Sequence, residues 1–305
     1  MAGEGYLVAE EAATVVLTRG GSRNIEVFLV KRHRRSGFMA GAYVFPGGKL
    51  DPADLDMKDE VMHPNVATLA SRLQATPGRP MPPPTQIGLV VAACRELFEE
   101  AGVLLATSAA EPADEGEQRH WGQLIKNREA VAGGHESFEE LLRKESLQLN
   151  AQNLGYWAHW ITPSAEKRRF DTRFFVAKLP SGQSPSADGR EITETRWMTP
   201  VAALQAQRDG SIFLPPPTLR TLEDISLFQT QKDLFAFANK QTPFAIMPKI
   251  SKAGTDTSIV LPWDREYATL EGEGLGFSAT DHRFVTSPSR IVFDGSGWLS
   301  IDNRA

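Results

Sequence analysis

The longest stretch of regular apolar spacing in this chain runs from Gln86 to Leu105. Its apolar residues recur at intervals of three and four, the spacing that places side chains on one face of an α-helix. Gly102 follows the last of them, as is typical of a helix end. The sequence therefore predicts a long helix with one buried side. The apolar positions are Ile87, Val90, Val91, Cys94, Leu97, Phe98 and Ala101.

Three glutamates of this helix, Glu96, Glu99 and Glu100, fall on the side opposite the apolar residues. At about 100° per residue, the other two lie within roughly 60° of Glu96 around the helix axis. Like charges at this spacing repel one another. A divalent cation removes that repulsion, and carboxylates are ligands that Mg²⁺ prefers. Arg95 lies one turn before Glu99 and can orient its carboxylate. The alternative interpretation is a solvated acidic face on an amphipathic helix.

Short β-branched and apolar runs predict strands, and a glycine-containing segment between the first two predicts a hairpin. Together with the helices they indicate an α/β (α+β) protein. The expected strands are Ala12–Leu17, Ile25–Val30, Leu154–Ile161, Arg173–Leu179, Thr195–Met198, Thr257–Leu261, His282–Thr286, Arg290–Phe293 and Trp298–Ile301. Further helices are expected at Gln118–Lys126, Ser137–Glu145, Val201–Gln207, Leu219–Phe228 and Gln231–Asn239.

The segment 52–85 differs in character from its surroundings. Met62–Gln74 can hold a short helix, but the prolines after it predict an irregular connection. We therefore expect an insertion that lies outside the core, near the mouth of the site. The prolines are Pro77, Pro80, Pro82, Pro83 and Pro84.

Composition narrows the class of protein. With 41% hydrophobic and 23% charged residues, the chain of 305 residues has the make-up of a globular protein. A net charge of −5 gives no support to nucleic-acid binding. Its one cysteine, Cys94, excludes an intrachain disulfide, and no apolar run is long enough to span a bilayer. Neither a signal peptide nor a Ser-Lys-Leu-type peroxisomal address is apparent, so a cytoplasmic location is expected.

The segment Arg95–Val103, Arg-Glu-Leu-Phe-Glu-Glu-Ala-Gly-Val, resembles the second half of the Nudix box. Gly48 resembles the glycine that opens the box. The resemblance implies an α/β/α sandwich that uses Mg²⁺ (or Mn²⁺) and water to cleave a nucleoside diphosphate linked to another group. It also implies that metal is held by Glu96, Glu99, Glu100 and a backbone carbonyl near Gly48, and that Arg95 and Glu99 serve catalysis.

The box departs from its usual pattern in two ways. Gly48 precedes Arg95 by forty-seven positions, which is much farther than in an uninterrupted box. The position of the usual glutamate between them, counted back from the arginine, is Ile87. That glutamate normally braces the joint between loop and helix, so its absence weakens the motif without removing the chemistry.

An interrupted box resembles the coenzyme A diphosphatases related to the mammalian peroxisomal enzyme. That resemblance covers about residues 10–230 and implies coenzyme A or an acyl derivative as substrate, with ADP-ribose, NADH or a nucleotide sugar as alternatives. The coenzyme A signature is only partly met, because Gly37 stands where an arginine is expected. The segments that carry the resemblance include Val44–Gly48, Trp160–Pro163, Arg169–Thr172 and Leu214–Thr218.

Basic and acidic residues outside the helix are candidates for contact with the substrate. Arg32 and Arg35 lie in a basic loop before the glycine turn, and Arg169 precedes a strand; guanidinium groups suit phosphates. Glu191 is a candidate for a further catalytic glutamate. The alternatives are an exposed basic hairpin end, an ion pair of Arg169 with Asp171, and an exposed strand carboxylate.

We expect a Nudix domain over 8–230, with the insertion at about 52–85, and a β-rich C-terminal extension over 243–305. The expected partner is a small-molecule nucleotide, with neither nucleic acid nor membrane; a homo-oligomer is left open. A non-catalytic Nudix-fold binding module is the competing interpretation. Such modules generally lose box glutamates, whereas this chain keeps all three.

Overall fold

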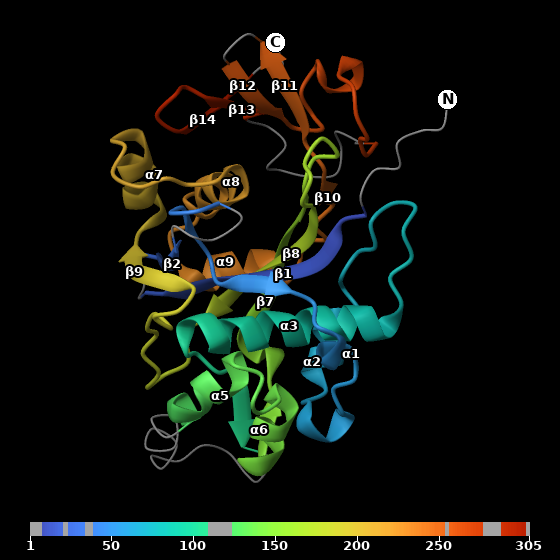
Figure 1. The fold of residues 1–305 in the computed structure, drawn as a ribbon, viewed down its shortest axis with the longest axis vertical. Coiled ribbons are helices and arrows are strands. Elements are labelled where there is room, and N and C mark those ends of the chain that lie inside the picture. The colour runs from blue at the N-terminus through green and yellow to red at the C-terminus, as the bar shows by residue number, and fades with distance from the viewer. Residues whose placement is uncertain are drawn as a thin grey trace.

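The computed structural model describes residues 8–20, 24–33, 39–108, 124–253, 256–276 and 288–302. In this part of the chain, helices cover both faces of a mixed sheet of eight strands, and a four-stranded sheet stands at one end of the molecule (Figure 1). The predicted α/β/α sandwich with a β-rich C-terminal sheet is confirmed.

The main sheet has the strand order β10-β7-β8-β1-β2-β3, with β4 paired to β1 and β9 paired to β2. β1 and β2 form the predicted antiparallel hairpin, while β1 and β8 run parallel. The strands are β1 Glu10–Arg19, β2 Glu26–Arg32, β3 Tyr43–Val44, β4 Gly47–Lys49, β7 Leu154–Ile161, β8 Phe170–Lys178, β9 Ile192–Met198 and β10 Ala245–Ile246.

The sheet separates two hydrophobic cores. On β1, Val15 and Leu17 pack toward α3 (Pro83–Ala101), whereas Val16 packs with the helices on the opposite face. This follows from the strand geometry, which sends successive side chains to opposite faces. The opposite face is covered by α7 Pro200–Arg208, α8 Pro216–Ile225 and α9 Gln231–Ala238.

The predicted long helix is α3, but its ends differ from the prediction. Pro83 and Pro84 form its first turn and are not part of an irregular connection. Proline is tolerated there because the first amides of a helix have no intrahelical acceptor. Gly102 adopts a left-handed conformation with φ 68° and ends the helix before the expected Leu105.

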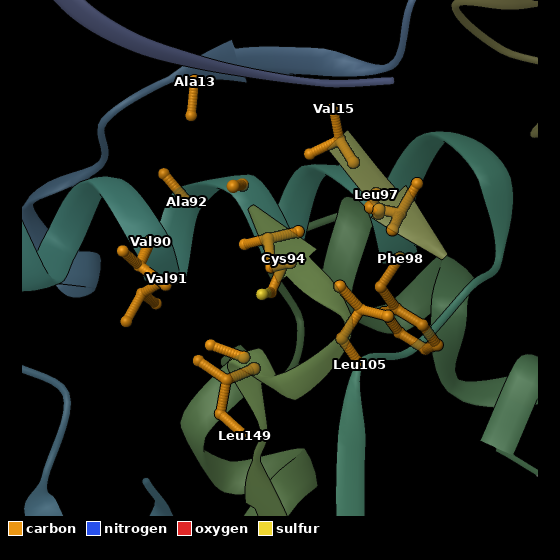
Figure 2. Packing of buried hydrophobic residues seen from close by; sticks show 14 of the residues in the cluster. Ala13, Val15, Val90, Val91, Ala92, Cys94, Leu97, Phe98, Leu105 and Leu149 are labelled. Atoms are coloured by element: carbon orange, nitrogen blue, oxygen red, sulfur yellow. The ribbon is translucent and has the colours of Figure 1, made fainter. Parts of the chain in front are cut away.

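Buried hydrophobic side chains pack against α3 from two sides (Figure 2). Ala13 and Val15 of β1 lie on one side of the helix, and Leu105 and Leu149 lie on the other. Cys94 is completely buried in this cluster, and burial raises the pKa of its thiol to about 12. The thiol is therefore a packing group. The far side is closed by β5 Ala106–Ser108, β6 Leu147–Leu149, α5 Arg128–Ala132 and α6 Phe138–Lys144.

The insertion contributes to the core, contrary to the expectation that it lies outside. It forms two short helices, α1 Pro52–Leu55 and α2 Asn65–Ala70, next to α3 (Figure 1). Apolar spacing over six residues is too short to distinguish a buried helix from an exposed one, so this packing could not be predicted from the sequence. Its core residues are Met57, Val61, Val66, Leu69, Ala70 and Leu73.

The C-terminal residues form the strands β11 Lys249–Ala253, β12 Asp256–Val260, β13 Arg290–Phe293 and β14 Trp298–Ile301 in an antiparallel sheet. Earlier in the extension, β10 pairs in parallel with β7, so the extension also completes the main sheet.

Two expected elements are not tested by the structure. The expected strand His282–Thr286 lies outside the described residues. Most of the expected helix Gln118–Lys126 also lies outside them, and at its end Ile125–Asn127 forms a 3₁₀ turn. No helix in the described part of the chain combines the length and apolar character that crossing a bilayer requires.

Candidate active site

A cavity of about 1510 Å³ opens beside the C-terminal half of α3. The box helix and β4 supply one part of its lining, and the C-terminal sheet supplies another. Residues more than two hundred positions apart in the sequence therefore share one site. The box residues in the lining are Gly47, Gly48, Arg95, Glu96, Glu99 and Glu100.

The three helix glutamates face this cavity with different environments. Glu100 is 6% exposed, and one of its oxygens accepts a hydrogen bond of 2.9 Å from the amide of Gly47. Glu96 and Glu99 both contact the guanidinium of Arg95, at 2.9 and 3.2 Å. The helix and the glycine loop are thus joined through side chains of the predicted acidic face.

Arg95 is fully occupied by structural contacts. Its Nε and Nη2 donate to the two carboxylate oxygens of Asp54 at 2.8 and 2.9 Å, and Nη2 also donates to the carbonyl of Lys49 at 3.0 Å. Such bidentate pairing is strong and directional. Asp54 is 2% exposed and also caps α1 by accepting from the amide of Asp51. Arg95 therefore holds Glu96 and Glu99 in place, and its catalytic role stays a prediction.

Asp54 corrects the alignment of the box. Counting back from Arg95 gave Ile87, a half-buried residue packed against the core around α3. Counting forward from Gly48 gives Asp54, six positions on, which is where an uninterrupted box has its bracing glutamate. The brace is therefore present as an aspartate. Most of the segment 52–85 follows Asp54, so the backward count passed through inserted residues. The spacing from the glycine is the signal that finds Asp54.

Gly48 lies directly against the acidic cluster. A Cβ at this position would come within 2.2 Å of a carboxylate oxygen of Glu96, and one at Gly47 within 2.4 Å of the carbonyl of Ala13. At Gly47 the obstacle is the backbone of β1, so this position requires glycine, whereas at Gly48 it is the end of the Glu96 side chain. The structure thus brings Gly48 to the acidic face, as the predicted site requires.

The pKa values of the three box glutamates are all raised, and burial is the largest cause. Burial raises the pKa of Glu96 to about 7, with a smaller contribution from the nearby Glu99, and Arg95 only partly opposes it. Burial, and then the charge of Glu96, raises the pKa of Glu100 well above its ordinary value. These carboxylates therefore carry their charges reluctantly in the absence of a cation.

This donor set fits a divalent cation, although the side chains are turned toward protein partners. Among the described residues, no three His, Cys, Asp or Glu side chains stand close enough together to hold an ion as they are. Glu96 is turned to Arg95 and Glu100 to the Gly47 amide. A cation would supply the positive charge that these buried oxygens lack.

The structure distinguishes the other predicted site residues. Arg32 and Glu191 line the cavity, and their charges act on Glu100 with opposite signs: Arg32 lowers the pKa of that carboxyl and Glu191 raises it. The side chain of Asp188 accepts from the Glu191 amide at 3.1 Å and holds this loop in place. Arg35 lies outside the described residues.

Arg169 does not line the cavity. It is 6% exposed, donates to the carbonyl of Thr162 at 3.1 Å and pairs with Glu273 of the C-terminal extension at 3.3 Å. Asp171, its partner in the alternative interpretation, contacts Arg173 and His159. Arg168, the neighbour of Arg169, reaches the cavity instead. Both arginines precede β8, where no strand alternation fixes the side that each side chain takes, so the sequence could not distinguish them.

Comparisons with known proteins show which family the chain belongs to. A family described as the NUDT19 Nudix domain matches residues 9–225. Acyl-coenzyme A diphosphatase NUDT19 of Xenopus laevis is 28% identical over 258 residues, which are 72% of this chain and 64% of that protein. The chain therefore spans slightly less than two thirds of that relative's length.

Two further comparisons agree with the first. The human protein of the same name is 27% identical over 267 residues, which are 74% of this chain and 71% of that protein. A crystal structure of a Nudix hydrolase from Alicyclobacillus acidocaldarius shares the fold, with a TM-score of 0.54 and 24% identity over 75% of this chain and 96% of its own.

The family match covers the sandwich from β1 to the end of α8. It includes both halves of the interrupted box, joined in space by Asp54 and Arg95. The chain belongs to the Nudix family, in the branch described as the NUDT19 Nudix domain.

Proposed function

We propose that the protein is a Mg²⁺-dependent (or Mn²⁺-dependent) diphosphatase that cleaves coenzyme A or acyl-coenzyme A. The observation that carries this proposal is the cluster of Glu96, Glu99 and Glu100 against Gly47 and Gly48, at the wall of a large cavity. The names of the relatives, acyl-coenzyme A diphosphatases, support the substrate.

In the proposed reaction, water attacks one phosphorus of the diphosphate, and the bond from that phosphorus to the bridging oxygen breaks. Coenzyme A gives 3′,5′-adenosine diphosphate and 4′-phosphopantetheine. Mg²⁺, held by the three glutamates and a carbonyl near Gly48, would neutralise charge on the diphosphate and acidify the water. Glu99 and Glu191 are the candidates to accept the proton of the water, and Arg95 keeps Glu99 in place.

A screen of purified protein against a diphosphate library by mass spectrometry tests the reaction. The library contains coenzyme A, acyl-coenzyme A, ADP-ribose, NADH and nucleotide sugars, each with Mg²⁺, with Mn²⁺ and with EDTA. We expect the highest kcat/KM for a coenzyme A compound and no turnover with EDTA. A higher kcat/KM for ADP-ribose or NADH would contradict coenzyme A as the substrate. If no compound is turned over, the result favours a non-catalytic binding module.

Arg32 tests the coenzyme A assignment at one residue. It lines the cavity beside the box and suits the 3′-phosphate, which ADP-ribose and NADH lack. A charge-assisted hydrogen bond contributes about 1.5–3 kcal/mol. Dephospho-coenzyme A should therefore be hydrolysed roughly ten- to a hundred-fold less efficiently, at ~1.4 kcal/mol per decade. Arg32→Ala should remove most of this preference in kcat/KM; an unchanged preference assigns the 3′-phosphate elsewhere.

A further inference from the structure

One face of the C-terminal sheet closes the catalytic cavity. The pairing sets Ile250 opposite Ile259, and Lys252 opposite Thr257, so that all four project from the same face. Trp298 joins that face through Phe293, which is opposite both Thr257 and Trp298. Among the described residues of the four strands, those that line the cavity all belong to this face. They are Ile250, Lys252, Thr257, Ile259 and Trp298. We refer to these five residues as the C-terminal wall.

Contacts to the sandwich fix the C-terminal wall in place. Glu273 pairs with the buried Arg169 at 3.3 Å, and its amide donates to Ser164 Oγ at 3.0 Å. The side chain of Gln207 in α7 donates to the carbonyl of Trp298 at 3.3 Å. Ile291 of β13 is completely buried in the core on the α7–α9 side. The wall is therefore a built part of the site.

The chemical character of the wall differs from that of the box. Ile250, Ile259 and Trp298 are apolar and half-buried, and Lys252 is its one charged side chain. The same cavity is also lined by prolines and aromatic residues of the sandwich. They are Phe45, Trp160, Phe174, Pro215, Pro216 and Pro217.

We propose that the C-terminal wall binds the acyl chain of the substrate. This proposal rests on the proposed function, and it assigns the part of the binding site that lies away from the box glutamates. Ligand pockets commonly measure about 300–1,000 Å³, and this cavity of about 1510 Å³ exceeds that range. The carboxylate end fits a metal-bound diphosphate, whereas aliphatic side chains with few directed donors fit a hydrocarbon chain rather than a second base or sugar. Chain length then sets specificity on the wall, away from the reacting phosphorus.

The test compares kcat/KM for octanoyl-coenzyme A and coenzyme A in matched variants. Each buried methylene contributes up to about fourfold. In the wild type, kcat/KM for octanoyl-coenzyme A should exceed that for coenzyme A by more than about tenfold. In Ile250→Asp this ratio should fall most of the way to one, because a carboxylate on the wall disfavours a hydrocarbon chain. Leu299→Asp is the matched control, since Leu299 lies in the same sheet, is 38% exposed and is absent from the cavity lining. It should keep the wild-type ratio.

The outcomes separate the wall from the reaction. An unchanged ratio in Ile250→Asp with wild-type circular dichroism, or an equal loss in Leu299→Asp, overturns the proposal for the wall. If Ile250→Asp does not fold, Ile250→Ala should lower the ratio by severalfold. S-octanoylpantetheine, which has no diphosphate, should bind the wild type more tightly than Ile250→Asp by tryptophan fluorescence. If coenzyme A compounds are not hydrolysed, the proposed function fails, and this binding alone decides the wall.

Discussion

A single guanidinium organises the acidic end of the cavity. Arg95 contacts Asp54, Glu96 and Glu99, which belong to two segments about forty positions apart in the sequence. The carboxylates thus share one cation, and their remaining negative charge is what a divalent ion would balance. At the scale of residues, the Asp54–Arg95 pair holds the glutamates to which we assign the metal.

Glu99→Gln and Glu100→Gln should each lower kcat by orders of magnitude at saturating Mg²⁺. Each removes a charge from the proposed metal site while keeping the size of the side chain. Circular dichroism and thermal melting should show an intact fold. Near-native kcat in both variants would remove these residues from the metal site.

Asp54→Ala should lower both stability and kcat, because it leaves the guanidinium of Arg95 without its bidentate partner. Breaking a buried pair on one side costs about 3–5 kcal/mol. Asp54→Glu restores the residue type of an uninterrupted box and should recover most of the kcat. Urea unfolding and kcat, measured on all three proteins, check this; loss of stability in Asp54→Ala without any change in kcat would make the pair purely structural.

At this scale, the sequence predicted those arrangements of side chains that depend on residues close together in the chain. The shared face of Glu96, Glu99 and Glu100 follows from helical geometry alone. Asp54 was missed because a fixed spacing was counted across an insertion. Arg169 was assigned to the substrate because its burial under Glu273 depends on residues more than a hundred positions away.

At the scale of elements, a buried polar cluster fastens the insertion to the sheet. Asp171 on β8 accepts from Thr76 at 2.6 Å and contacts His159 of β7 at 2.6 Å. Arg173 pairs with Asp171 and donates to the carbonyl of Gln74 at 3.0 Å. The segment that precedes α3 is therefore held at its backbone and at its side chains.

His159 makes this fastening sensitive to acid. The side chain is completely buried, and burial lowers the pKa of its imidazole below the ordinary 6.5. Well above pH 6.5 neither the folded nor the unfolded protein binds this proton, so the contribution to stability is complete. As pH falls below 6.5 the unfolded state takes up the proton first, and the free energy of unfolding falls by up to about 1.4 kcal/mol per pH unit.

Urea unfolding of wild type and His159→Gln at pH 7, 6 and 5 checks this slope. Other groups titrate in both proteins, so the difference between the two isolates the histidine. We expect the wild type to lose more stability than the variant between pH 6.5 and 5. Equal slopes would mean that the imidazole is protonated in the folded protein.

Elements with long or strict periodicity were predicted well. β7 and β14 have the predicted bounds, and α3 differs at its ends. The two-residue strand β3 was missed because it is too short to show alternation. β11 was missed because two lysines and a serine interrupt the apolar pattern by which a strand is recognised in a sequence.

At the scale of the whole molecule, the cavity is assembled from parts that the sequence keeps apart. The box end and the C-terminal wall come from opposite halves of the chain. Their convergence depends on the strand order, which no local pattern encodes. The fold class was predictable from the Nudix box, whereas the extension's part in the site was not.

Removing divalent metal should destabilise the whole protein. A ligand at a hundred times its Kd contributes about 2.7 kcal/mol to folding. At about 2–4 °C per kcal/mol, Mg²⁺ should raise the Tm by roughly 5–10 °C over the value with EDTA. The gain should be smaller at pH 6 than at pH 8, because protons compete for Glu96, whose pKa is raised to about 7 by burial.

Scanning calorimetry with EDTA and with Mg²⁺ at both pH values measures this. Glu96→Gln and Glu100→Gln serve as variants in which the gain should shrink. A wild-type Tm that is indifferent to Mg²⁺ at both pH values would contradict metal binding by the cluster.

The position of the insertion has a consequence for how this family can diversify. The two halves of the box are joined by the Asp54–Arg95 pair and not by the length of chain between them. Sequence can be gained or lost after α1 without moving a reactive atom, provided that the core residues around α2 keep their volume. We expect related genes to vary most in length between Thr76 and Pro82 and to preserve the seven residues from Gly48 to Asp54. The Nudix box of this protein is therefore defined by contacts in the folded structure, and the length of the chain between its two halves can change during evolution.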